Sequence, residues 1–149
     1  IIFLVRKCRY YIMSDIRNKM EELKNEFSIF DDPREKYIYL VDIAKKSPGV
    51  NPADQNDKNK VYGCTSQAWI LCEEDSDKTY NFHTDSDAMI VKGLLFILQR
   101  LFNGHNKKEI LSINGDNILK EIGLGDSISS QRTNGFGAAI HKIQNELVV

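Results

Sequence analysis

Apolar residues recur at intervals of three or four along much of the chain, a spacing that marks one face of a helix. Residues 14–27 are predicted to form the first helix, with an apolar face of Ile16, Met20, Leu23 and Phe27. A second helix is predicted from Pro33, because Asp32 is a favoured N-cap and Glu35 completes a capping box. The breakers at 47–49 end it, so the two segments predict a helical hairpin.

The hydrophobic period changes in the middle of the chain. Residues 51–59 are polar and rich in turn formers, so we expect an exposed loop there. Residues 60–62, 67–72 and 78–83 are short, extended segments bounded by turn residues. They predict three antiparallel strands in a small meander, with a break at 63–66 between the first two.

Helical spacing returns after the strands. The most apolar helix is predicted over residues 87–102, with Asp85-Ser86 as its N-cap. The remaining helices are a short one at a capping box of Asn106 and Glu109, another over 117–122, and a last one from about Gln131 to Leu147. The pattern predicts an α+β fold, with helices packed on one face of a three-stranded antiparallel sheet.

The first twelve residues are expected to lie outside the domain. An apolar run at 1–5 precedes basic residues and then Met13, the reverse of the order in a secretory signal. We interpret residues 1–12 as upstream or appended sequence and 13–149 as a single domain, with a short targeting remnant as the alternative. The longest apolar stretch, 89–102, falls short of the ~20 residues that cross a bilayer, so no membrane partner is expected.

Charge and cysteine content narrow the function classes. The 149 residues carry 20 Lys and Arg against 21 Asp and Glu, a net charge of −1. Such a balance argues against a non-specific nucleic-acid binder, which has a basic excess. The cysteines are too few and too scattered for a disulfide framework, and they favour a reducing, cytoplasmic compartment: Cys8, Cys64 and Cys72.

Cys64 is the main candidate for a reactive side chain. It lies at a break in the strand pattern, directly after Gly63, which permits unusual backbone angles. Amide groups and hydroxyls nearby, including that of Ser66, can stabilise a thiolate or a charged sulfur adduct. A buried structural thiol is the alternative, and the pattern alone does not decide between them.

Other clusters have simpler explanations. Cys72 lies within a predicted strand and is interpreted as a small sheet residue. A zinc site of Cys64, Cys72 and His83 lacks both the usual cysteine spacing and a fourth ligand, so no metal is expected. Asp85 and Asp87 could hold a divalent cation, but helix capping and favourable charge at a helix N-terminus explain them.

Two further chemical possibilities stay open at this point. A cysteine hydrolase would need a histidine beside Cys64, and nothing in the sequence places one there from among His83, His105 and His141. Arg132, at the start of the last helix, can steady an anionic sulfur through a charge-assisted hydrogen bond. An exposed first-turn arginine is the plainer interpretation.

The segment Val61-Tyr-Gly-Cys-Thr-Ser-Gln-Ala-Trp69 resembles the SufE family of sulfur-acceptor proteins, whose reactive cysteine lies in Gly-Cys-x-Ser-x-x-Trp. Further blocks agree in order and spacing at 35–37, 85–93 and 130–135, and together they span residues 15 to 147. Gly137 departs from the pattern, since an acidic residue is common there, and it is expected to loosen the last helix.

This resemblance implies a fold shared with IscU-type iron–sulfur scaffolds and a role in sulfur transfer. A SufE-like protein takes persulfide sulfur from a SufS-type, pyridoxal-phosphate-dependent cysteine desulfurase and stimulates that enzyme. It then hands the sulfur to a SufBCD-type scaffold complex. By likeness, Cys64 is the acceptor, Asp87 affects mobility of the cysteine loop, and Arg132 lies near the site.

The resemblance also implies a relay protein rather than a self-sufficient enzyme. The chain itself is expected to hold no cofactor and no metal, because the pyridoxal phosphate belongs to the desulfurase. Its state as a monomer or a homodimer is open. An IscU-type scaffold, which needs several converging ligands, is the runner-up, and a cysteine-dependent hydrolase comes third.

Overall fold

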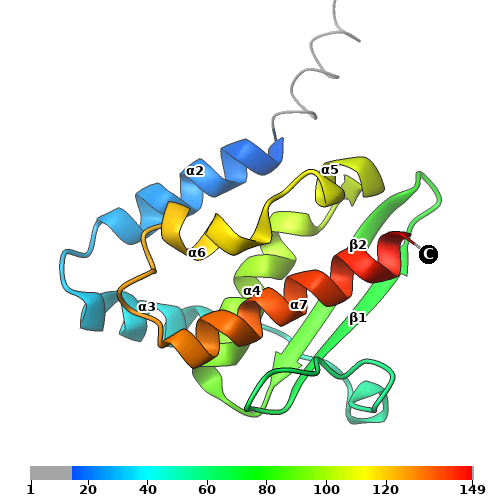
Figure 1. Ribbon diagram of the computed structural model, residues 1–149, viewed down its shortest axis with the longest axis horizontal. Coiled ribbons are helices and arrows are strands. Elements are labelled where there is room, and N and C mark those ends of the chain that lie inside the picture. Colours follow the sequence, from blue (N-terminus) through cyan, green and yellow to red (C-terminus); the bar gives the residue numbers. More distant parts are fainter. Residues whose placement is uncertain (1–14, 149) are drawn as a thin grey trace, which may run out of the picture.

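The structure is a computed structural model that describes residues 15–148, so the interpretation of residues 1–12 lies outside the described part (Figure 1). In chain order the elements are α2 (Asp15–Ser28), α3 (Pro33–Lys45), η1 (Pro52–Asp54), β1 (Ala68–Glu74), β2 (Thr79–Ser86), α4 (Met89–Phe102), β3 (His105–Asn106), α5 (Lys107–Leu111), η2 (Gly115–Asn117), α6 (Ile118–Glu121) and α7 (Ser130–Val148). The predicted α+β class is confirmed.

Several predicted helix ends are confirmed in atomic detail. The Asp32 carboxylate accepts a hydrogen bond from the amide of Arg34 at 2.9 Å, and Pro33 opens α3. Asn106 and Glu109 form the complete capping box of α5. Helix α7 is continuous across Gly137, so the expected loosening does not interrupt it.

The sheet is antiparallel and three-stranded, in the order β1-β2-β3. Its third strand is not the predicted one. Residues 60–62 contribute only a bridge, Lys60 opposite Trp69, while β3 pairs with the far edge of β2. The chain turns at Tyr62-Gly63 before a strand can grow, and a β3 of two residues is too short to show a period of two.

The predicted cap of the apolar helix is also wrong. Strand β2 continues through Asp85 to Ser86, and α4 begins at Met89 after Ala88, whose side chain makes no capping bond. The Asp85 carboxylate is engaged elsewhere, in a contact distant in sequence that the local motif does not reveal.

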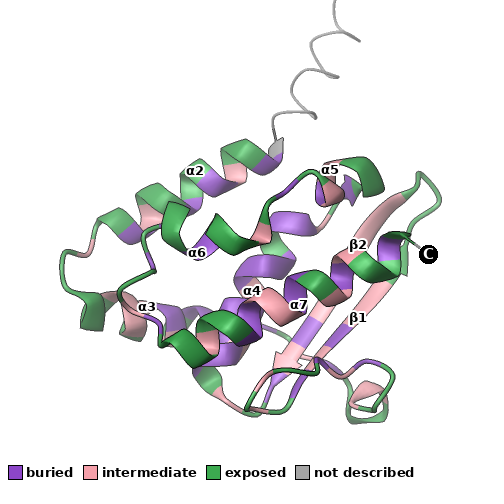
Figure 2. Ribbon diagram, in the orientation of Figure 1, coloured by how far each residue is buried: buried purple, intermediate pink, exposed green. Residues whose placement is uncertain are grey.

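Helix α4 is the centre of the hydrophobic core. It contacts α2, α3, β2 and α7, and most of its surface is buried (Figure 2). A helix that is apolar nearly all round is expected to be surrounded. Alternate residues of strand β2 face α4 and are buried, so one face of the sheet is covered. These residues are Phe82, Thr84 and Ser86. Within residues 15–148, no helix is long and apolar enough to span a bilayer.

Candidate functional site

Cys64 lies on a short loop that projects from the start of β1. A backbone hydrogen bond of 2.8 Å from the Val61 amide to the Ala68 carbonyl closes the loop at its base. Gly63 has a φ of +94°, in the left-handed region that side chains disfavour. The Cys64 side chain is partly exposed, so the loop presents the thiol at the surface without releasing it fully to solvent.

The far end of the loop is fastened at Gln67. Its amide donates to the Asp87 carboxylate at 3.0 Å, and its carbonyl accepts from the Asp87 amide at 3.1 Å. The Ser86 hydroxyl also donates to this carbonyl, at 2.7 Å. The junction between β2 and α4 therefore holds one end of the cysteine loop, and Asp87 is its main contact.

A narrow apolar pocket lies beside the Cys64 thiol. Its free volume of about 10 Å³ is close to the space that one water molecule needs. Arg132 and Gly135 of α7 line it together with Cys64, and the rest of the wall is apolar: Val61, Ala68, Val91, Leu94, Leu95 and Phe136. The pocket has room for one additional atom bonded to the Cys64 sulfur, and Arg132 supplies a positive charge near it.

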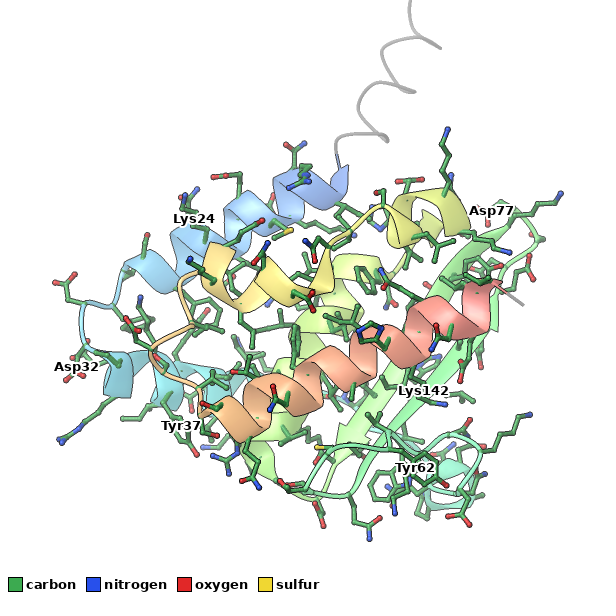
Figure 3. The ribbon with its side chains drawn as sticks, viewed as in Figure 1. Lys24, Asp32, Tyr37, Tyr62, Asp77 and Lys142 are labelled. Atoms are coloured by element: carbon green, nitrogen blue, oxygen red, sulfur yellow. The ribbon has the colours of Figure 1, made fainter. Side chains whose placement is uncertain are left out.

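The preceding loop is attached to the same helix. Lys142 lies on α7 (Figure 3) and donates a hydrogen bond to the Lys58 carbonyl at 3.2 Å. Tyr62, next to the site glycine, is largely exposed, and its hydroxyl donates to the Asp57 carbonyl at 3.3 Å. Helix α7 thus supports the cysteine loop and the segment that leads into it.

Asp85 organises the region behind the loop, a role that sequence reasoning missed. Its carboxylate accepts from the Val50 amide at 2.9 Å and forms an ion pair with Lys92 at 3.4 Å. Both side chains are mostly buried, with 13% and 23% of their area exposed. Gly49, at a φ of +71°, passes so close that a Cβ there would meet Asp85 Oδ2 at 2.5 Å.

We predict that Asp85→Asn lowers the free energy of unfolding by about 2 kcal/mol. The amide leaves the Lys92 ammonium without its counter-charge in a mostly buried position. Urea unfolding followed by circular dichroism measures the loss. Asp126→Asn makes the same chemical change at an exposed carboxylate and is expected to cost almost nothing. Equal stability of the two variants would contradict this role of Asp85.

Cys72 differs sharply from Cys64. It lies opposite Phe82 in the sheet and is partly buried. Burial raises the pKa of the Cys72 thiol to about 11, and the carboxylates of Glu146, Glu74 and Glu73 add to the rise. Because the thiolate is the nucleophilic form, Cys72 is a poor acceptor at neutral pH.

The raised pKa predicts the pH dependence of Cys72 alkylation. In the folded chain its iodoacetamide rate should still rise beyond pH ~9.5, where an ordinary thiol of pKa about 8.5 has levelled off. The native state holds this proton longer than the unfolded state, so the thiol's contribution to stability falls as pH rises from the ordinary value toward about 11. Peptide mass spectrometry reads the rate, with the urea-unfolded chain as control. A folded rate that plateaus with the unfolded one would refute the prediction.

The histidines are placed away from the thiol. His83 lies 3.4 Å from Glu73 on the sheet, His105 is buried near the Phe102 carbonyl, and His141 lines a separate groove on α7. None of them lines the Cys64 pocket. In the described part of the chain, no three His, Cys, Asp or Glu residues gather as a metal site would require.

The structure brings the five candidate site residues together. Gly63 and Ser66 lie on the loop with Cys64, and Arg132 lines its pocket. Asp87 holds the far end of the loop through its carboxylate and its backbone amide, which both contact Gln67. Sequence reasoning missed the contact with Gly135 and the fastening at Gln67. The contact with Gly135 had one indication in the sequence, a glycine inside the last predicted helix. Glycine at such a position favours close approach of another segment.

Comparison with known proteins identifies the family. The sequence model of the SufE family, described as an Fe-S metabolism associated domain, matches residues 21–147. The chain belongs to the SufE family. The predicted resemblance is confirmed. The family supports a role in iron–sulfur metabolism as a sulfur-transfer protein of a relay or activator kind. It also implies a cysteine desulfurase as partner.

Relatives and a solved structure agree with this assignment. An uncharacterized SufE-like protein of Rhizobium meliloti is 32% identical over 130 residues, covering 85% of this chain and 93% of its own. A second, of Rhizobium etli, is 32% identical over 133 residues, covering 87% and 90%. The solution structure of a hypothetical protein from Thermus thermophilus superposes with a TM-score of 0.71 at 17% identity, covering 87% and 93%, which supports the fold alone.

Proposed function

We propose that this SufE protein accepts sulfur on Cys64 from the persulfide of a SufS-type cysteine desulfurase, stimulates that enzyme, and passes the sulfur to a SufBCD-type scaffold complex. The observation that carries the proposal is the placement of Cys64 on a glycine-containing surface loop beside an apolar pocket. The family match, to a domain associated with Fe-S metabolism, supports a role in sulfur transfer.

The reaction is an exchange between sulfur atoms without net oxidation. The Cys64 thiolate attacks the outer sulfur of the donor's persulfide, and a new S–S bond forms on Cys64. The donor's S–S bond breaks, and the outer sulfur passes to Cys64 with any proton that it carries. The donor cysteine leaves as a thiolate, which takes up a proton from solvent. The rate depends on the thiolate fraction of the attacker, the pKa of the leaving thiol, and access.

Neighbouring residues fit defined parts of this exchange. Arg132 lines the pocket, and its guanidinium stabilises an anionic sulfur by a charge-assisted interaction. Gly63 allows the loop to change its backbone angles when Cys64 swings toward a donor. Asp87 limits that motion through its two contacts with Gln67. Ser66 supplies a hydroxyl on the same loop.

No observation favours the two alternatives. An iron–sulfur scaffold needs several converging ligands, and no such group occurs over residues 15–148. A cysteine hydrolase needs a base in hydrogen-bond reach of the thiol, and the Cys64 pocket has no histidine in its wall.

The proposal is tested by adding the chain to a purified SufS-type desulfurase with cysteine and a thiol reductant. Sulfide release is expected to rise several-fold and to reach a plateau as the chain is titrated. The Cys72→Ser variant should stimulate as well as the unchanged chain, because Cys72 is held as the unreactive thiol. A rate that stays flat over the whole titration would count against the proposal.

A further inference from the structure

Gly135 lies directly against the reactive cysteine. A Cβ built on Gly135 would stand 3.2 Å from Cys64 Sγ and 3.6 Å from both its Cα and Cβ. The first of these separations is closer than most carbon contacts in proteins. Cys64 therefore occupies the space that a side chain at this position of α7 would fill.

The neighbouring glycine of the same helix shows that this contact is specific. Gly137 is also within α7, yet a Cβ there would meet nothing within 4 Å. Either glycine weakens the helix relative to alanine. Only at Gly135 is that cost offset by close approach of another segment.

The loop touches α7 a second time, one turn further along. A Cβ on Gly63 would lie 3.3 Å from the Ala138 Cβ. Arg132, one turn before Gly135, lines the Cys64 pocket. The helix face of 132, 135 and 138 therefore runs beneath the loop, and the thiol rests on its middle position.

We propose that Gly135 is the positioning residue that sets how deeply Cys64 sits at its pocket, and so limits access to the sulfur while no donor is docked. The inference rests on the proposed function of Cys64, because sheltering matters for a thiol that carries labile sulfur. A methyl group at 135 displaces the sulfur outward, since the helix backbone beneath it cannot yield as a flexible side chain would.

The first test measures alkylation at Cys64 alone, by iodoacetamide and peptide mass spectrometry on the full chain. Gly135→Ala is expected to react several-fold faster than the unchanged protein, and Gly137→Ala at the unchanged rate. Equal rates for both variants would overturn the proposal. No desulfurase is present, so this result does not depend on whether the proposed sulfur transfer occurs.

A thermal double-mutant cycle tests the same contact by a measurement that does not involve alkylation. Gly137→Ala is expected to raise the melting temperature by roughly 3 °C through better helix propensity. Gly135→Ala should fall short of this gain in the unchanged chain and recover it in a Cys64→Ala background. The same shift in both backgrounds would show that Cys64 and Gly135 are not coupled, contrary to the proposal.

A third measurement tests whether Gly135 also protects a persulfide on Cys64. If persulfide forms on Cys64, a mild thiol reductant should remove its outer sulfur faster from Gly135→Ala than from Gly137→Ala. Equal removal rates would overturn the sheltering role. Failure of the unchanged chain to acquire sulfur, together with a clear difference in alkylation between the variants, would instead refute the proposed function and leave the contact established.

Discussion

Replacing Cys64 with serine is expected to reduce stimulation of the desulfurase to the level of that enzyme alone. A serine hydroxyl is essentially un-ionised at neutral pH and cannot displace a thiolate from a persulfide. The substitution replaces a single atom, the sulfur, in a partly exposed side chain. Folding should be unaffected, so the loss concerns the chemical step, and sulfide release with thiol reductant measures it.

Cys72→Ser is the matched control for this change. Both variants remove one thiol, but the Cys72 thiol lies in the sheet with its pKa raised to about 11. We expect full stimulation from Cys72→Ser and none from Cys64→Ser. The opposite result, or equal partial losses, would mean that the acceptor is wrongly assigned.

Gly93→Ala is expected to lower the free energy of unfolding by about 3 kcal/mol, the largest effect on stability that we anticipate. Gly93 lies where α4 crosses α3, and a Cβ there would stand 2.5 Å from the Leu40 carbonyl oxygen. A backbone oxygen cannot rotate away. The two helices must separate, and buried core contacts of Leu40 and its neighbours are lost.

Gly137→Ala makes the same substitution within another helix and gives the comparison. Its added methyl group meets nothing within 4 Å, so a gain of about 1 kcal/mol from helix propensity is expected. Chemical denaturation of both variants measures the difference. If Gly93→Ala is as stable as the unchanged chain, the helices pack less closely than this account requires.

Local sequence features predicted most of the helices. Asp32 caps α3 and Asn106 caps α5, because each cap involves residues two or three positions apart. The same reasoning failed at Asp85-Ser86, which looks like a cap. There the carboxylate binds Val50 and Lys92 instead, and the 35-residue separation from Val50 is invisible to a local pattern.

For the candidate site too, some features could be predicted from local sequence and others could not. Cys64 and Gly63 could be selected from their place at a break in the strand pattern. The shape of the site could not, because it depends on α7, whose Gly135 comes from far along the chain to lie against the thiol. Strand β3 was missed for a related reason, since its two residues pair with β2 without any periodicity of their own.

The most direct test of the central claim is a single-turnover transfer followed by mass measurement. Desulfurase loaded with persulfide is mixed with the chain in the absence of reductant, and the peptides of the chain are weighed. We expect one additional sulfur atom on the peptide that contains Cys64 and none on the peptide that contains Cys72. Additional sulfur on Cys72, or none on the chain while the desulfurase stays loaded and competent, would contradict it.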